Sequence, residues 1–91
     1  MMAAARFIVS GKVQGVYYRA STRDHAIALG VMGSARNLDD GSVEVVAVGT
    51  GNAISELERW LWQGPPRAKV ADVCREELAV APNGVRDFVT G

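Results

Sequence analysis

Apolar residues recur along this chain with a period of two in some stretches and with a helical period in others. The clearest period of two covers residues 42–48, where Val43, Val45 and Ala47 lie on one face of an extended chain. The preceding Asp39-Asp40-Gly41 is typical of a tight turn, because aspartate and glycine tolerate a positive φ. The pattern therefore predicts a β-hairpin whose second strand has one apolar face.

Two other stretches follow the helical period of 3.6 residues and predict helices at 20–29 and 52–63. Gly30 follows the first as a natural C-cap, and Gly64-Pro65-Pro66 should end the second. The apolar stripes are Thr22, Ala26 and Leu29 in the shorter helix and Ile54, Leu57 and Leu61 in the longer. Both helices are thus expected to pack one side against a sheet, and Trp60 is expected to join that core.

The remaining apolar runs complete a βαββαβ order. The predicted elements are a strand at 6–9, a helix at 20–29, strands at 31–38 and 42–48, a helix at 52–63, a strand at 70–78, a turn at 82–84 and a short final strand at 85–89. This order predicts an α+β, ferredoxin-like sandwich in which two helices cover one face of an antiparallel sheet. Since this fold hosts many functions, the function must be argued from particular residues.

Length and charge narrow the class of protein. We expect 91 residues, 1–91, to form a single domain with one modest core. Ten basic and ten acidic residues give no basic bias, which argues against nucleic acid as a partner. No run reaches the roughly 18 apolar residues of a membrane span, and we expect a monomer in the cytoplasm.

The single cysteine, Cys74, permits neither an intramolecular disulfide nor a site of several cysteines for a metal. It lies within the strand predicted at 70–78, and we expect it to be a buried or half-buried side chain there. His25, the only histidine, is expected to be a surface or half-buried helix residue with no catalytic role.

The candidate chemistry lies in the loop from Gly11 to Arg19, between the first predicted strand and the first helix. Backbone amides at the start of a helix have no partner within the helix and can bind an anion. Gly15 lets the backbone approach a ligand closely, and the guanidinium of Arg19 fits phosphate oxygens. The loop therefore predicts a small phosphate site. One of its two tyrosines, Tyr17 or Tyr18, should enter the core behind it.

Two segments together resemble the signature blocks of the acylphosphatase family. The first is Gly11-Lys12-Val13-Gln14-Gly15-Val16-Tyr17-Tyr18-Arg19, and the second runs from Gly33 through Arg36-Asn37 to Asp40-Gly41-Ser42-Val43-Glu44. The resemblance covers almost the whole chain. It implies an enzyme that hydrolyses the carboxyl–phosphate bond of acyl phosphates to carboxylate and inorganic phosphate, with no metal or other cofactor.

The resemblance also implies roles for particular residues. Arg19 matches the family's catalytic, phosphate-binding arginine, and Asn37 matches its catalytic asparagine, which holds the attacking water. The residues that match the loop whose amides surround the phosphate are Gln14, Gly15, Val16, Tyr17 and Tyr18. The chain departs from the family at Ser34-Ala35, where Trp-Val is usual, and after Phe88, where the family often continues with arginine and tyrosine.

Two other functions are compatible with the residues taken alone. A non-catalytic module on this fold could use the loop to bind an anion, and Asn37 would then be only a residue at the entry of the hairpin. An RNA-binding domain has a similar topology but usually places aromatic residues on its strands beside a basic surface, whereas the strand at 42–48 has no aromatic residue. Phosphate binding without turnover would favour the module, and a gel-shift with single-stranded RNA would test the RNA-binding domain.

Overall fold

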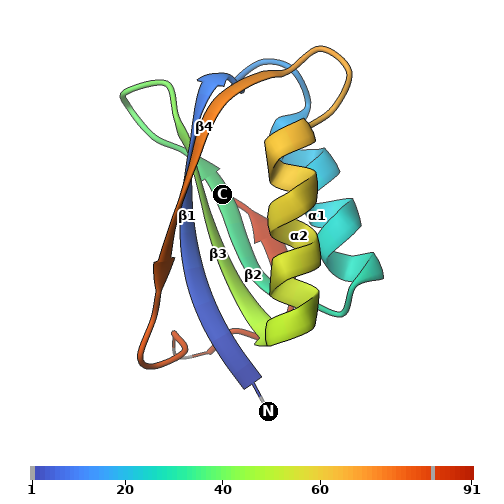
Figure 1. The fold of residues 1–91 in the computed structure, drawn as a ribbon, viewed down its shortest axis with the longest axis vertical. Helices are drawn as coiled ribbons and strands as arrows, with labels where there is room; N and C mark the ends of the chain where they lie inside the picture. Colours follow the sequence, from blue (N-terminus) through green and yellow to red (C-terminus); the bar gives the residue numbers. More distant parts are fainter. Residues whose placement is uncertain (1, 83) are drawn as a thin grey trace.

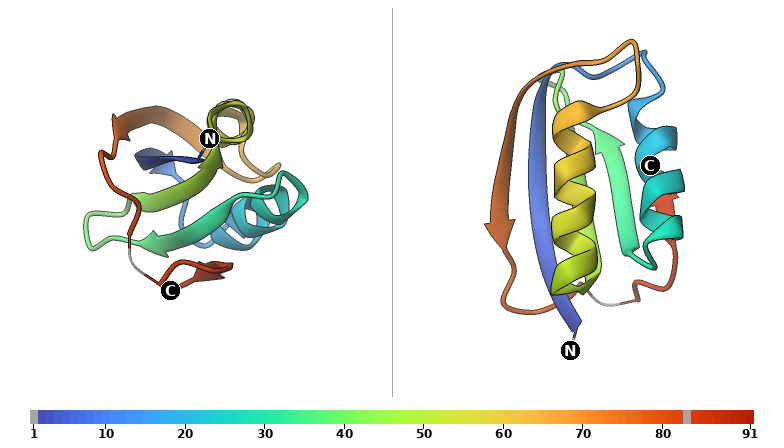
Figure 2. Two further views of the ribbon diagram at one scale, coloured as in Figure 1. Left: turned by 90° about the horizontal axis from the view of Figure 1, so that it is seen from below. Right: turned by 45° about the vertical axis from the view of Figure 1, so that its right-hand side comes forward.

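The computed structural model describes residues 2–82 and 84–91, which form one five-stranded sheet and two helices. The elements are β1 (Met2–Lys12), α1 (Tyr18–Ala28), β2 (Met32–Asn37), β3 (Val43–Thr50), α2 (Gly51–Gln63), β4 (Lys69–Glu77) and β5 (Phe88–Thr90). Both helices lie against the same face of the sheet, as the views in Figures 1 and 2 show. The predicted ferredoxin-like α+β sandwich is confirmed.

The strands lie in the order β4-β1-β3-β2-β5. The first four pair antiparallel, as expected, with Phe7 of β1 opposite Val45 of β3 and Ala35 of β2 opposite the same Val45. The short β5 then pairs parallel to β2, so that the complete sheet is mixed. The pairing of β1 with β4 shifts register between Ser10 and Gly11, close to where the chain leaves β1 for the loop.

The core lies between the sheet and the helices, on the faces that the periodicity predicted. Val43, Val45 and Ala47 of β3 are fully buried. The apolar stripe of α2, namely Ile54, Leu57 and Leu61, is fully buried against them, as are Thr22 and Ala26 of α1. At about 25 cal/mol per Å² of apolar surface, this shared layer supplies the main favourable term in folding.

The opposite face of the sheet is uncovered by helices and has a charged centre. Nε of Arg6 donates to Glu44 at 2.6 Å, and Nε of Arg36 donates to the second oxygen of the same carboxylate at 2.7 Å. Partial burial alone would raise the pKa of Glu44, but the hydrogen bonds from the two arginines outweigh it and lower that pKa. The three strands β1, β3 and β2 are therefore tied together by one carboxylate.

The expectation about one side chain is corrected, and that about another is confirmed in part. Cys74 is exposed, not buried, because β4 is an edge strand and Cys74 alternates with the buried Val73. Trp60 packs against the core but is only half-buried, and its ring also lies against that of the exposed His25, 4.3 Å between centroids. The predicted turn at 82–84 includes Asn83, which lies outside the described residues.

Candidate active site

The phosphate loop was predicted at residues 11–19, and in the structure residues 13–17 of this segment connect β1 to α1 at one end of the sheet. Buried side chains hold this connection on both sides of its glycine. Val13 and Val16 are buried, and Gly15 between them has φ of +74°, a conformation that favours glycine. A Cβ at Gly15 would meet open space, so the backbone conformation, not the packing, requires glycine there. The loop therefore has a defined conformation, which its buried side chains and the backbone of Gly15 hold in place.

The two tyrosines after Val16 point in opposite directions, and one of them enters the core as expected. Tyr17 has φ of +62° and is 78% exposed, whereas Tyr18 is 1% exposed and donates its hydroxyl to the carbonyl of Leu61 at 2.6 Å. Burial raises the pKa of the Tyr18 phenol, so it stays a neutral donor. Tyr18 thereby fixes the first turn of α1 against the end of α2, and with it the direction of Arg19.

The N-terminus of α1 is open for an anion. Tyr17 precedes the helix without a capping side-chain hydrogen bond, so the first backbone amides of α1 have no partner within the helix and face away from its body. The partial positive charge of the helix end adds to the charge of the half-buried Arg19 in this first turn. Among the described residues, the guanidinium of Arg19 has one hydrogen bond, a long one of 3.4 Å to the Gly91 carbonyl oxygen.

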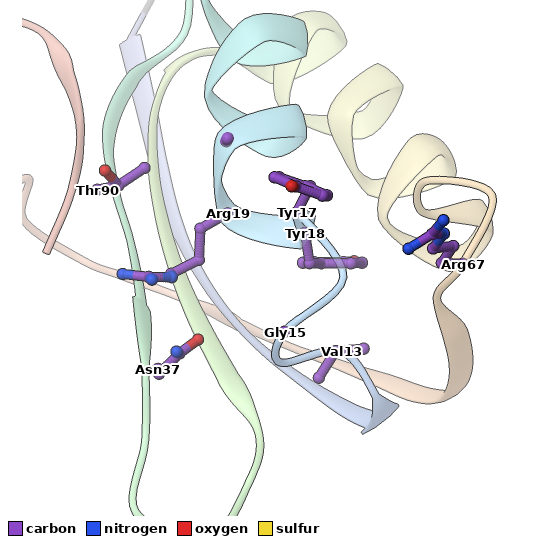
Figure 3. A pocket seen from close by; sticks show the side chains of 9 residues that line it. Val13, Gly15, Tyr17, Tyr18, Arg19, Asn37, Arg67 and Thr90 are labelled. Carbon is purple, nitrogen blue, oxygen red and sulfur yellow. The ribbon is translucent and has the colours of Figure 1, made fainter.

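Asn37 reaches this place from the other half of the chain. It is the last residue of β2 and lies on the same sheet face as Ala35, so its side chain projects toward the helices. The side-chain amide of Asn37 makes no hydrogen bond to another described residue, although its backbone pairs with Val43 of β3. In Figure 3 the Asn37 and Arg19 side chains extend toward one another, with Thr90 of β5 close to Arg19.

A cavity of about 390 Å³ opens between these elements and brings most of the predicted site together. Its lining includes five of the seven predicted site residues, namely Gly15, Tyr17, Tyr18, Arg19 and Asn37. The others are Val13, Ala20, Arg67 and Thr90. The sequence did not predict a role for Arg67, which lies in the loop between α2 and β4, because a single charge beside two prolines is typical of a solvated turn.

Gln14 and Val16 do not line the cavity with their side chains. Nε2 of Gln14 donates to the carbonyls of Leu38 and Ser42, each at 2.9 Å, and the Val16 side chain is buried. Gln14 thus ties the phosphate loop to the β2–β3 hairpin, close to where Asn37 ends β2. A contact of either residue with phosphate through its backbone amide stays a prediction.

Ser34 stands where the family usually has tryptophan, and this difference does not affect the cavity. Ser34 points to the opposite face of the sheet, where it lines a separate cavity of about 470 Å³ together with Val46 and Arg86. None of the residues that line that cavity lines the first.

Two structural findings bear on the other classes of function. Across residues 2–82 and 84–91, no three His, Cys, Asp or Glu side chains lie close enough to hold a metal ion, and no helix is both long and apolar enough to cross a membrane. The aromatic residues on strands, Phe7 and Phe88, are both buried, so the open sheet face offers no exposed ring from these residues for stacking on an RNA base.

Comparison with known proteins agrees with the resemblance. A family model described as Acylphosphatase matches residues 5–90. An acylphosphatase of Xanthomonas euvesicatoria pv. vesicatoria is 64% identical over 90 residues, which cover 99% of this chain and all of that protein. An acylphosphatase structure from Coxiella burnetii superposes with a TM-score of 0.91 at 42% identity, covering 99% of this chain and 93% of the other. That of Bacillus subtilis superposes with a TM-score of 0.92 at 33% identity, covering 100% and 99%.

Proposed function

The chain belongs to the acylphosphatase family and is a hydrolase of acyl phosphates, and we propose that Arg19 and Asn37 carry out its reaction without a metal ion. The observation that supports these roles most is the position of both side chains on one cavity beside the open N-terminus of α1. We further propose that it acts as a single domain, as a monomer and in the cytoplasm, with acyl phosphate as substrate and phosphate as product.

The phosphoryl group would be held by charge and backbone donors together. Arg19 offers parallel N–H donors to two phosphate oxygens, and the free amides between Gly15 and Tyr18 offer donors to the third. These donors match the charge that spreads over the equatorial oxygens in the transition state of phosphoryl transfer. Because the protein holds them in place before substrate binds, the reaction does not have to reorganise solvent.

Asn37 would place the nucleophile. Its amide oxygen can accept a hydrogen bond from water, and its amide N–H can donate to the phosphoryl group or to the water oxygen. The leaving group is a carboxylate, which departs without protonation. Besides binding of the phosphoryl group, the reaction therefore mainly requires that the attacking water be oriented toward phosphorus. No general base, reactive cysteine or metal ion is required by this scheme.

The test is hydrolysis of benzoyl phosphate with and without a chelator. Wild-type protein should turn over equally in both, with competitive inhibition by inorganic phosphate. Arg19→Ala should lower kcat/KM by about 10³-fold or more, the magnitude typical of an arginine that stabilises phosphoryl transfer. Asn37→Ala should lower kcat about 10²-fold while the inhibition constant of phosphate changes little, since one oriented hydrogen-bonding group is lost.

Arg23→Ala is the matched control, because Arg23 lies one turn further along α1 and pairs with the exposed Asp24 outside the cavity. It should keep wild-type kcat. A folded wild type that binds phosphate but hydrolyses no acyl phosphate would contradict the proposal and favour an anion-binding module instead.

A further inference from the structure

A second arginine lines the cavity and has no role in the scheme above. Arg67 lies in the loop between α2 and β4, and its exposed side chain pairs with no carboxylate among residues 2–82 and 84–91. Two of the nine residues that line the cavity are arginines, and none is Asp or Glu. A phosphoryl group held by Arg19 and the helix amides leaves the charge of Arg67 without a partner.

The loop that holds Arg67 is packed against the site. Gly64 is buried, has φ of +67°, and lies so close to α1 that a Cβ there would be 3.0 Å from the ring of Tyr18. The amide of Gly64 donates to the Trp60 carbonyl at 2.8 Å, and that of Ala68 donates to the Pro65 carbonyl at 3.0 Å, which closes a turn around Arg67. The backbone of Arg67 is therefore fixed relative to Tyr18, and so to the neighbouring Arg19.

The position of Arg67 in the cavity indicates which part of a substrate it would meet. In Figure 3, Arg19 and Asn37 lie on one side of the loop at Gly15, and Arg67 lies on the other. In phosphoryl transfer the attacking and leaving oxygens are roughly in line on opposite sides of phosphorus. If Asn37 places the water, the acyl group leaves on the side away from Asn37, toward Arg67.

Other cations gather at this end of the molecule. Lys12, the last residue of β1, pairs across the sheet with Lys69, the first residue of β4, and both are exposed. In Figure 1 these strand ends and the loop after α2 lie together at the end of the sheet where α1 begins. The cations at this end, Arg19, Arg67, Lys12 and Lys69, outnumber the two carboxylates of the β2–β3 turn, Asp39 and Asp40, and this balance favours approach of a ligand with more than one negative charge.

We propose that Arg67 binds a second anionic group on the acyl part of the substrate, so that this enzyme prefers acyl phosphates that carry a distal carboxylate or phosphate. This proposal rests on the proposed function, because it uses the in-line direction set by Asn37 and Arg19. Arg67 is then a residue that determines specificity and not a catalytic one. Its planar guanidinium can bind either anion through paired N–H donors.

The experiment compares three substrates that differ at one position: benzoyl phosphate, 4-carboxybenzoyl phosphate and 4-phosphonobenzoyl phosphate. Wild-type kcat/KM should be about three- to tenfold higher for a charged substrate than for benzoyl phosphate. Arg67→Gln should bring that ratio close to one through KM, with kcat on benzoyl phosphate unchanged, and Arg67→Lys should restore part of it. The preferred charged substrate then identifies the distal group as carboxylate or phosphonate-like.

Arg86→Gln is the matched control, because Arg86 is also exposed and lines the cavity on the opposite face of the sheet. It should keep the wild-type ratio. The preference should also weaken between about 20 and 300 mM salt, since the Debye length falls from roughly 20 Å to below 8 Å.

Equal ratios in wild type and Arg67→Gln would overturn this proposal while leaving the hydrolase in place, whether kcat/KM is unchanged or falls equally on all three substrates. The second of these results would mean that Arg67 acts on the reacting carboxyl–phosphate group itself. Absence of any hydrolysis of benzoyl phosphate by the folded wild type would instead overturn the proposed function, and this inference with it.

Discussion

Replacing Tyr18 with phenylalanine removes one oxygen from the junction between α1, α2 and the phosphate loop. The Tyr18 hydroxyl donates to the carbonyl of Leu61 at 2.6 Å, and both residues are buried. Leu61 lies in the last turn of α2, where its carbonyl would need the amide of residue 65, but Pro65 has no N–H. Tyr18 is thus the donor that satisfies this helix end.

Loss of that donor leaves a buried carbonyl without a partner, which costs about 1–3 kcal/mol. For a chain of this size, each kcal/mol corresponds to roughly 4–8 °C in Tm. Tyr18→Phe should therefore lower Tm by about 4 °C or more at pH 8. Tyr17→Phe is the control, since Tyr17 is 78% exposed and its loss of a hydroxyl should change the free energy of unfolding by less than about 0.5 kcal/mol.

The same hydroxyl makes the stability depend on alkaline pH. Burial raises the pKa of Tyr18 in the folded state above the value of about 10 expected in the unfolded chain. A raised folded pKa contributes stability that is fully present below about pH 10 and is lost as pH rises above it, because the unfolded state then ionises first. Between pH 8 and pH 11 this loss amounts to about 1.4 kcal/mol for wild type and is absent in Tyr18→Phe.

Urea denaturation of wild type, Tyr18→Phe and Tyr17→Phe at pH 8 and pH 11 measures both effects. The difference in free energy of unfolding between wild type and Tyr18→Phe should shrink by about 1.4 kcal/mol at the higher pH. A difference that stays constant between the two pH values would refute the assignment of Tyr18 as a buried neutral donor. So would a Tyr18→Phe protein as stable as wild type at pH 8.

Two further predictions concern the ties between distant parts of the chain. Gln14→Ala removes two hydrogen bonds from the hairpin that follows Asn37, so it should cost about 1–2 kcal/mol in urea denaturation and lower kcat on benzoyl phosphate severalfold, while Lys12→Ala leaves both unchanged. Glu44→Gln leaves two arginines without their shared carboxylate and should cost about 1–3 kcal/mol at pH 7. Because the pKa of Glu44 is lowered on folding, its contribution is present above about pH 4.3 and lost below it, so the difference from wild type should shrink at pH 3. A constant difference across that range would contradict this account.

Periodicity along the chain was enough to predict the elements and their inward faces, because it is a local property of the backbone. The alternation at Val43, Val45 and Ala47 and the helical spacing of Ile54 and Leu57 each identified buried residues before any partner was known. Individual boundaries differ by several residues: α1 begins at Tyr18 rather than at residue 20, and β1 extends to Lys12. Strand and helix ends depend on pairing and caps that periodicity does not encode.

Which side chains meet across the chain became clear only in three dimensions. Gln14 contacts carbonyls 24 and 28 residues away, and Arg67 reaches the cavity from a loop about 50 residues beyond the one that binds phosphate. Cys74 is exposed because β4 lies at the edge of the sheet. The parallel pairing of β5 likewise depends on β5 lying beside β2, at the edge opposite β4. Such contacts follow from strand order and packing, for which residues compete over the whole chain. The spacing of residues along the sequence does not show which of the possible partners they contact.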